Sequence, residues 1–115
     1  MSRLDAYREF LASRGLSLEA LGLQERALSR SDALHAVGLV DSAGVPILGG
    51  DVYVETNGQI TSAYANWYAE PRDGESKTSF VARTYADTRT YISRYPNPPN
   101  GEPLFVLVTG DEHES

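Results

Sequence analysis

The sequence predicts an α+β domain, because helix-type and strand-type segments stand in separate groups and do not alternate as repeating βα units. Residues 3–14, 32–40 and 78–95 carry apolar side chains at helical spacing, whereas residues 45–68 and 104–109 are rich in β-branched and aromatic residues. A chain of 115 residues is long enough for one hydrophobic core and too short for two. We therefore expect one domain over residues 1–115, in which a small antiparallel or mixed sheet of three or four strands, with a central hairpin, packs against three or four helices.

The N-terminal part of the chain predicts two helices. The first is expected over residues 3–14, and the second begins at Ser31-Asp32 and stops at Gly44, a residue type that commonly ends helices. Between them we expect a short helical turn over residues 18–21 and a short edge strand over residues 27–29. Four leucines of this part are expected to fill the core: Leu16, Leu18, Leu21 and Leu23.

Residues 45–68 predict the central hairpin. Asn57-Gly58 lies between its two strands, and this pair favours the type I′ turn that matches strand twist. The turn fixes the register and places one set of pairs on one face: Glu55–Ile60, Tyr53–Ser62, Asp51–Tyr64, Gly49–Asn66 and Ile47–Tyr68. The other face is expected to meet the core, with Gly50 directly opposite Ala65: Leu48, Gly50, Val52 and Val54 against Trp67, Ala65, Ala63 and Thr61.

The C-terminal part predicts a loop, a helix and a strand. Residues 70–77 are polar and contain proline and glycine, which is typical of an exposed loop, and Ser76 or Thr78 is suited to cap a helix that ends by Tyr95. Prolines exclude regular structure over residues 96–103. The continuous apolar run 104–109 predicts a central strand buried on both faces, and residues 110–115 are expected to form a frayed acidic tail.

Composition limits the classes of function. The chain has no cysteine and a formal net charge of −6, so thiolate chemistry is excluded and we expect no direct contact with nucleic acid or a membrane. A basic protein partner fits this charge better. Neither His35 nor His113 is near a second ligand at metal spacing, and the terminal run Glu112-His113-Glu114 is not a preorganised site, so we expect neither a metal nor a cofactor. No apolar signal segment precedes the first helix, and the cytoplasm is the expected location.

Asp51 is the most unusual residue of the hairpin, because a carboxylate is disfavoured in the middle of a strand. One interpretation makes it a structural residue, hydrogen-bonded to Tyr64, Tyr53 or a backbone N–H. The other makes it part of a recognition surface, in which Tyr68 is an anchor and the following acidic loop contributes charge; Trp67 is expected to face the core. The candidate partner-binding residues are Asp51, Tyr53, Tyr64, Asn66, Tyr68, Glu70, Asp73 and Glu75.

Two segments also resemble a known family. The run Ile47-Leu48-Gly49-Gly50-Asp51-Val52-Tyr53, followed by Tyr64-x-Asn66-Trp67-Tyr68 and later by Tyr91-Ile92-x-x-Tyr95, is similar to the immunity protein 40 family of bacterial polymorphic toxin systems, and the resemblance covers roughly residues 21–108. It implies a non-catalytic protein that binds and neutralises one cognate toxin domain by occlusion. Two alternatives remain: a small ligand-binding or enzymatic domain that uses Asp51 with neighbouring tyrosines, and a homodimeric structural domain. The oligomeric state is left open.

Overall fold

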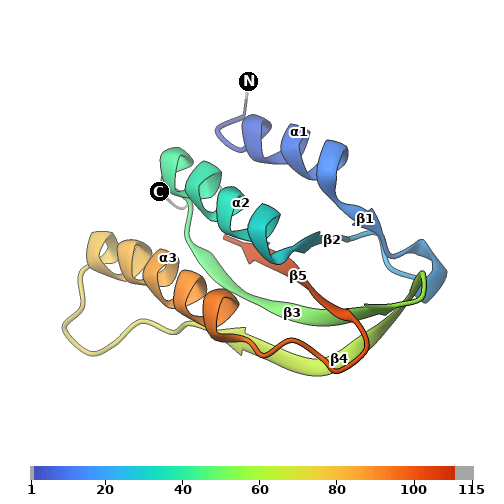
Figure 1. Cartoon of the computed structure of the whole chain (residues 1–115). Coiled ribbons are helices and arrows are strands. Elements are labelled where there is room, and N and C mark those ends of the chain that lie inside the picture. The colour runs from blue at the N-terminus through green and yellow to red at the C-terminus, as the bar shows by residue number, and fades with distance from the viewer. Residues whose placement is uncertain (1, 111–115) are drawn as a thin grey trace.

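The computed structural model describes residues 2–110, and the expected tail over 111–115 lies outside the described residues. Within these described residues, three α-helices and five strands follow one another in a mixed order (Figure 1). Their bounds are α1 Asp5–Arg14, β1 Leu16–Ser17, β2 Arg26–Ser29, α2 Arg30–Ala43, β3 Ile47–Thr56, β4 Gln59–Tyr68, α3 Lys77–Arg94 and β5 Glu102–Thr109, with a short 3₁₀ helix, η1, at Glu19–Leu21. Among the described residues, no helix has the length and apolar character needed to cross a membrane.

The five strands form one sheet in the order β1-β2-β5-β3-β4, and every neighbouring pair is antiparallel. The α+β class and the central position of β5 are therefore confirmed, and the mixed-sheet option is wrong. The expected number of strands was too low, because the two-residue strand β1 has no sequence pattern of its own. β2 is an inner strand between β1 and β5, and its prediction as an edge strand is wrong.

All three helices lie on one face of the curved sheet (Figure 1). Buried apolar residues of α2, β3 and β5, among them Val37, Val52 and Phe105, form the core between these layers. Polar groups of α3 fix the helix against the start of β3: Tyr85 Oη donates to the Val45 carbonyl at 2.7 Å, and the Ile47 amide donates to Thr84 Oγ1 at 3.1 Å. These bonds satisfy backbone groups that would otherwise be buried without partners.

Local capping explains where the helices begin and end. Ser29 Oγ accepts from the Asp32 amide at 3.3 Å, so α2 begins slightly earlier than Ser31, and Gly44 ends it in a left-handed conformation with φ of 71°. Ser76, one of the two residues expected to cap α3, accepts from the Ser79 amide at 3.1 Å. These bonds satisfy amides that have no partner within the helix.

Trp67 packs into the core, as expected, and Gly50 makes room for it. Its ring stacks on Tyr91 with 4.7 Å between centroids, and its Nε1 donates to Thr88 Oγ1 at 3.1 Å. Gly50 is paired with Trp67 and not with Ala65, and a β-carbon at position 50 would lie 2.3 Å from Trp67 Cη2. The glycine is therefore required by the close approach of the indole ring.

Two irregularities change the expected register. The pairs Glu55–Ile60 and Tyr53–Ser62 are confirmed, but the next pairs are Val52–Ala65 and Asp51–Asn66. Ala63 and Tyr64 have no partner on β3 and form a bulge, so the expected pairs Asp51–Tyr64, Gly49–Asn66 and Ile47–Tyr68 are wrong.

A second irregularity, between β3 and β5, inverts the expected burial at the start of β3. The register shifts between Ile47 and Gly49. Ile47 consequently lies in the core and Leu48 is exposed, which is the reverse of the prediction from strict alternation.

A smaller cluster covers part of the sheet face that points away from the helices, which we call the outer face. Leu18, which precedes η1, packs there against buried residues of the sheet, and Leu23 and Ile60 adjoin them. The sheet residues are Ala27, Tyr53, Leu104 and Val106. Leu16 and Leu21 are exposed, so their prediction as core residues is wrong.

Candidate functional site

The part of the outer face beyond this cluster is open to solvent. We call it the open patch, and its residues come from β3, β4 and β5: Leu48, Asp51, Tyr64, Asn66, Tyr68 and Val108. Tyr64 is 96% exposed and Tyr68 is 76% exposed, while Leu48 and Val108 add exposed aliphatic surface. Exposed aromatic and aliphatic side chains beside polar groups are typical of a protein–protein interface.

Asp51 is half-buried in this patch and lies opposite Asn66. Within residues 2–110, no hydrogen bond or ion pair reaches its carboxylate, and no buried side-chain oxygen lacks a partner. The carboxylate therefore meets solvent. The structural interpretation, in which Tyr64, Tyr53 or a backbone N–H binds Asp51, is wrong, and the carboxylate is available to a partner.

Tyr53 differs from the other tyrosines of the predicted site. Its side chain is only 8% exposed and belongs to the cluster that contains Leu18 and Leu104. Burial raises the pKa of its hydroxyl, and the negative charges of Asp51 and Glu25 raise it further. Tyr53 thus packs within the cluster on the outer face, and its role as a partner contact stays a prediction.

The strands that form the open patch carry negative charge and no positive charge. β3 carries Asp51 and Glu55, β5 carries Glu102, and none of the residues of β3, β4 and β5 is lysine or arginine. Glu55 is paired directly with Glu102 across the two strands. Strand alternation places both on the same face as Asp51. This face is therefore complementary to a cationic surface.

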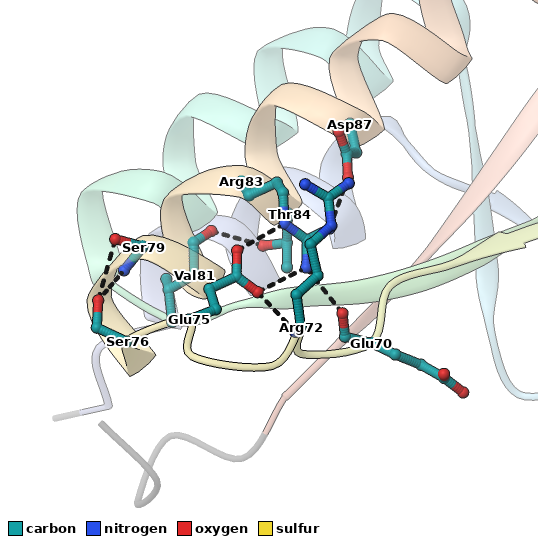
Figure 2. A network of polar contacts seen from close by, with 9 residues as sticks. All are labelled: Glu70, Arg72, Glu75, Ser76, Ser79, Val81, Arg83, Thr84 and Asp87. Carbon is teal, nitrogen blue, oxygen red and sulfur yellow. Dashed lines mark hydrogen bonds and ion pairs between the residues drawn. The ribbon is translucent and has the colours of Figure 1, made fainter.

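The acidic loop after β4 is held in place by Arg83, as Figure 2 shows. The Arg83 guanidinium binds the Glu75 carboxylate through Nε at 2.7 Å and Nη2 at 2.8 Å, and Nη2 also donates to the Glu70 carbonyl at 2.7 Å. Nη1 donates to Asp87 at 3.0 Å, and the Arg72 amide donates to Glu75 at 2.9 Å. We call this network the Arg83 clamp. It fixes both ends of the loop to α3.

The clamp changes the protonation chemistry of Glu75. The Arg83 hydrogen bonds lower the pKa of Glu75 to about 2, and the Arg72 amide contributes to the same direction. The side chains of Glu75 and Arg83 are only 12% and 17% exposed. Glu75 is thus occupied within the chain, and its predicted contact with a partner is not tested by this arrangement.

The other two acidic residues of the loop are free of the clamp. Figure 2 shows the Glu70 side chain extending away from the network, although its carbonyl is part of it. Asp73 is exposed, and it has no hydrogen bond or ion pair within the described part of the chain. The loop follows Tyr68 directly, so Glu70 and Asp73 extend the open patch along the chain.

The hollow at Asp51 is small for a ligand site. It has a volume of about 190 Å³ and is lined by residues that include Leu48, Asn66 and Val108, but Tyr53 and Tyr64 do not line it. Two larger hollows, of about 440 and 480 Å³, lie along α3, and a third, of about 370 Å³, lies beside the turn of the hairpin, where Leu18, Gly58 and Ile60 are among its lining residues. Pockets for small molecules commonly measure about 300–1,000 Å³. The hollow brings Asp51 together with Tyr68 and not with Tyr53 or Tyr64, and the ligand-binding and homodimer alternatives stay predictions.

Sequence reasoning missed several residues of this surface. Leu48 was placed in the core because a bulge is invisible to strict alternation, and Val108 was placed in a strand buried on both faces. Glu55 and Glu102 were not singled out, because their pairing depends on β5 returning between β2 and β3. The sequence signal for Glu55 and Glu102 was their negative charge alone.

Comparison with known families gives one match. Residues 17–109 match the family model described as Immunity protein 40. The match includes all five strands except the first residue of β1, together with α2, α3 and the acidic loop. No curated protein and no solved structure matches the chain.

Proposed function

Because the chain belongs to the immunity protein 40 family, we propose that it binds one cognate toxin domain of a bacterial polymorphic toxin system in the cytoplasm and blocks it without catalysis. The observation that supports this proposal is the open patch, where Tyr64 and Tyr68 are exposed and Asp51 has a carboxylate without a partner in the described residues. An exposed surface of this kind suits a protein partner better than a small ligand.

The proposed contact surface consists of the open patch and the loop that follows it. Tyr64, Asn66, Tyr68 and Asp51 contribute side chains from the hairpin, and Glu70 and Asp73 contribute charge. Glu75 supports the surface through the Arg83 clamp, and Tyr53 supports it through its packing. The inhibition is steric: the bound chain covers the active site of the toxin or a surface beside it.

Charge contributes to the rate of association in this proposal. A cationic toxin surface is attracted to the carboxylates of the patch and the loop, and such attraction raises association rates in a salt-dependent manner. Slow dissociation depends instead on buried aromatic anchors. Both steps are needed if the toxin is to be captured before it acts.

The test is co-expression of the chain with the toxin domain encoded by the neighbouring gene, followed by co-purification and a growth assay. We expect a stable complex and restored growth. Asp51→Lys combined with Asp73→Lys should weaken binding and the salt dependence of association, whereas Glu9→Lys, an exposed charge reversal on α1, should not. A chain that neither binds the toxin nor restores growth would refute the proposal.

A further inference from the structure

Tyr64 holds its side chain in a backbone conformation that tyrosine rarely adopts. Its φ is +55°, in the left-handed region where the β-carbon crowds the backbone. It is also the most exposed large apolar residue among residues 2–110. Its hydroxyl makes no hydrogen bond and its ring stacks on no other ring in this part of the chain. The Tyr64 side chain therefore contributes little to the stability of the fold, although its backbone conformation is strained.

We infer that Tyr64 is the anchor by which the open patch enters a pocket of the toxin domain, and that lysine or arginine side chains rim this pocket. The inference rests on the proposed function and adds the chemistry of the partner to it. Strained residues that contribute nothing to packing commonly occur at functional positions. Tyrosine is among the residues that dominate binding energy at interfaces, where its ring is buried and its hydroxyl reaches a polar group.

The bulge presents Tyr64 in a fixed position. The Tyr64 amide donates to Ser62 Oγ at 3.0 Å, and the pairs Tyr53–Ser62 and Val52–Ala65 hold the strand on both sides. The backbone of the anchor is therefore ordered before the partner arrives. A side chain presented in this way loses little further backbone freedom on binding.

The charge of the surrounding strands determines the chemistry of the pocket rim. Asp51, Glu55 and Glu102 share the outer face, and none of the residues of β3, β4 and β5 is a cation. Carboxylates that stand directly opposite each other, as Glu55 and Glu102 do, repel one another. A cationic rim relieves this repulsion, and arginine in particular also binds the face of a tyrosine ring.

The strain is tested without the partner, by urea unfolding of Tyr64→Gly and Tyr64→Asn. Both residues tolerate the left-handed region, so both variants should be more stable than the wild type. Relief of the strain should raise the folded-to-unfolded ratio several-fold and at most about 30-fold, part of which glycine loses to the greater freedom of its unfolded chain. Tyr68→Gly removes an exposed tyrosine of the same strand without a positive φ, and it should be less stable than the wild type.

The anchor is tested by the affinity for the toxin domain encoded by the neighbouring gene. Tyr64→Gly should weaken binding by about 30-fold or more. Tyr64→Phe keeps the ring and should bind more tightly than Tyr64→Gly. Thr61→Ala, a control on the same strand outside the open patch, should bind as the wild type does. Higher salt should weaken binding of the wild type.

The outcomes separate this inference from the proposed function. If the wild type does not bind the toxin domain, the proposed function fails and the anchor fails with it. If the wild type binds and Tyr64→Gly binds within about threefold of it, Tyr64 is not the anchor. Binding that does not change with salt would refute the cationic rim, and a Tyr64→Asn variant no more stable than the wild type would refute the strain.

Discussion

Gly50→Ala is expected to destabilise the protein strongly, although it adds a single methyl group. The β-carbon would lie 2.2 Å from the Val106 carbonyl oxygen and 2.3 Å from Trp67 Cη2, both far inside van der Waals contact. The carbonyl belongs to the central strand and the indole is wedged against α3, so neither moves without loss. The clash originates in packing alone, because Gly50 has no positive φ.

The magnitude follows from the contacts that must give way. Displacing the indole removes its hydrogen bond to Thr88, worth about 1 kcal/mol, and its stacking on Tyr91, worth about 0.5–1.5 kcal/mol. Overpacking of a core adds about 1–3 kcal/mol of strain if the ring stays where it is. The protein bears either the lost contacts, if the indole moves, or the strain, if the indole stays. We therefore expect the free energy of unfolding to fall by about 2–3 kcal/mol.

The assay is urea unfolding followed by the fluorescence of Trp67, the chain's one tryptophan. With a typical urea slope, this loss lowers the midpoint by about 1–3 M. Gly38→Ala is the matched control: it makes the same substitution inside α2, where a β-carbon meets nothing within 4 Å. It should stabilise the protein by up to about 1 kcal/mol. A Gly50→Ala midpoint equal to that of the wild type would refute the close approach of the indole.

Two further predictions concern α3. Trp67→Phe and Thr88→Val should each cost about 1–2 kcal/mol, and a double-mutant cycle should show that their effects on unfolding are not additive, because each variant breaks the same 3.1 Å hydrogen bond; additive effects would contradict that bond. The Arg83 clamp should make stability depend on pH: the pKa of Glu75 falls from 4.5 to about 2 on folding, so its contribution is complete above pH 4.5 and is lost as the pH falls toward 2. Arg83→Gln should return the pKa of Glu75, followed by NMR titration, toward 4.5, and a wild-type value near 4.5 would exclude the clamp.

Elements with a local signal were predicted well. Asn57-Gly58 placed the hairpin turn, Ser76 placed the start of α3, and the continuous apolar run placed β5 at the centre of the sheet. Each of these signals acts over a few residues: a positive φ, a capping oxygen, or burial on both faces. They do not depend on distant partners and can therefore be detected in the sequence.

Elements that depend on distant partners were missed. The bulge at Ala63 and Tyr64 contains no glycine to mark it, and it is visible only in the register between β3 and β4. β1 depends on residues nine and eleven positions further along, Arg26 and Ala27, which return beside it in β2. Glu75 was predicted to contact a partner, and its ion pair with Arg83 was not foreseen, because Arg83 stands eight residues further along on the next helix.

In the candidate site, too, features with a local sequence signal were predicted and features that depend on distant residues were missed. Sequence alternation put Asp51, Asn66 and Tyr68 on one face, and the structure agrees. It also put Tyr53 with them, but Leu18, which is distant from the hairpin in sequence, packs with that tyrosine in the smaller cluster. The exposure of a sheet face depends on which distant segments of the chain pack against it, and local sequence patterns do not predict that packing.

The position of β5 has a consequence for how the molecule assembles. β5 follows all the other strands of residues 2–110 in sequence, yet it joins β2 on one side to β3 on the other. Before the chain has reached Thr109, the hairpin and the N-terminal strands are two fragments that share no backbone ladder. Long-range pairing of this type slows folding, because the chain loses conformational entropy on closing the connecting segments before the stabilising contacts form. The open patch, which includes Val108 of β5, is therefore complete only after β5 has paired with β3, and a nascent chain stopped before β5 presents two separate strand pairs in place of one sheet.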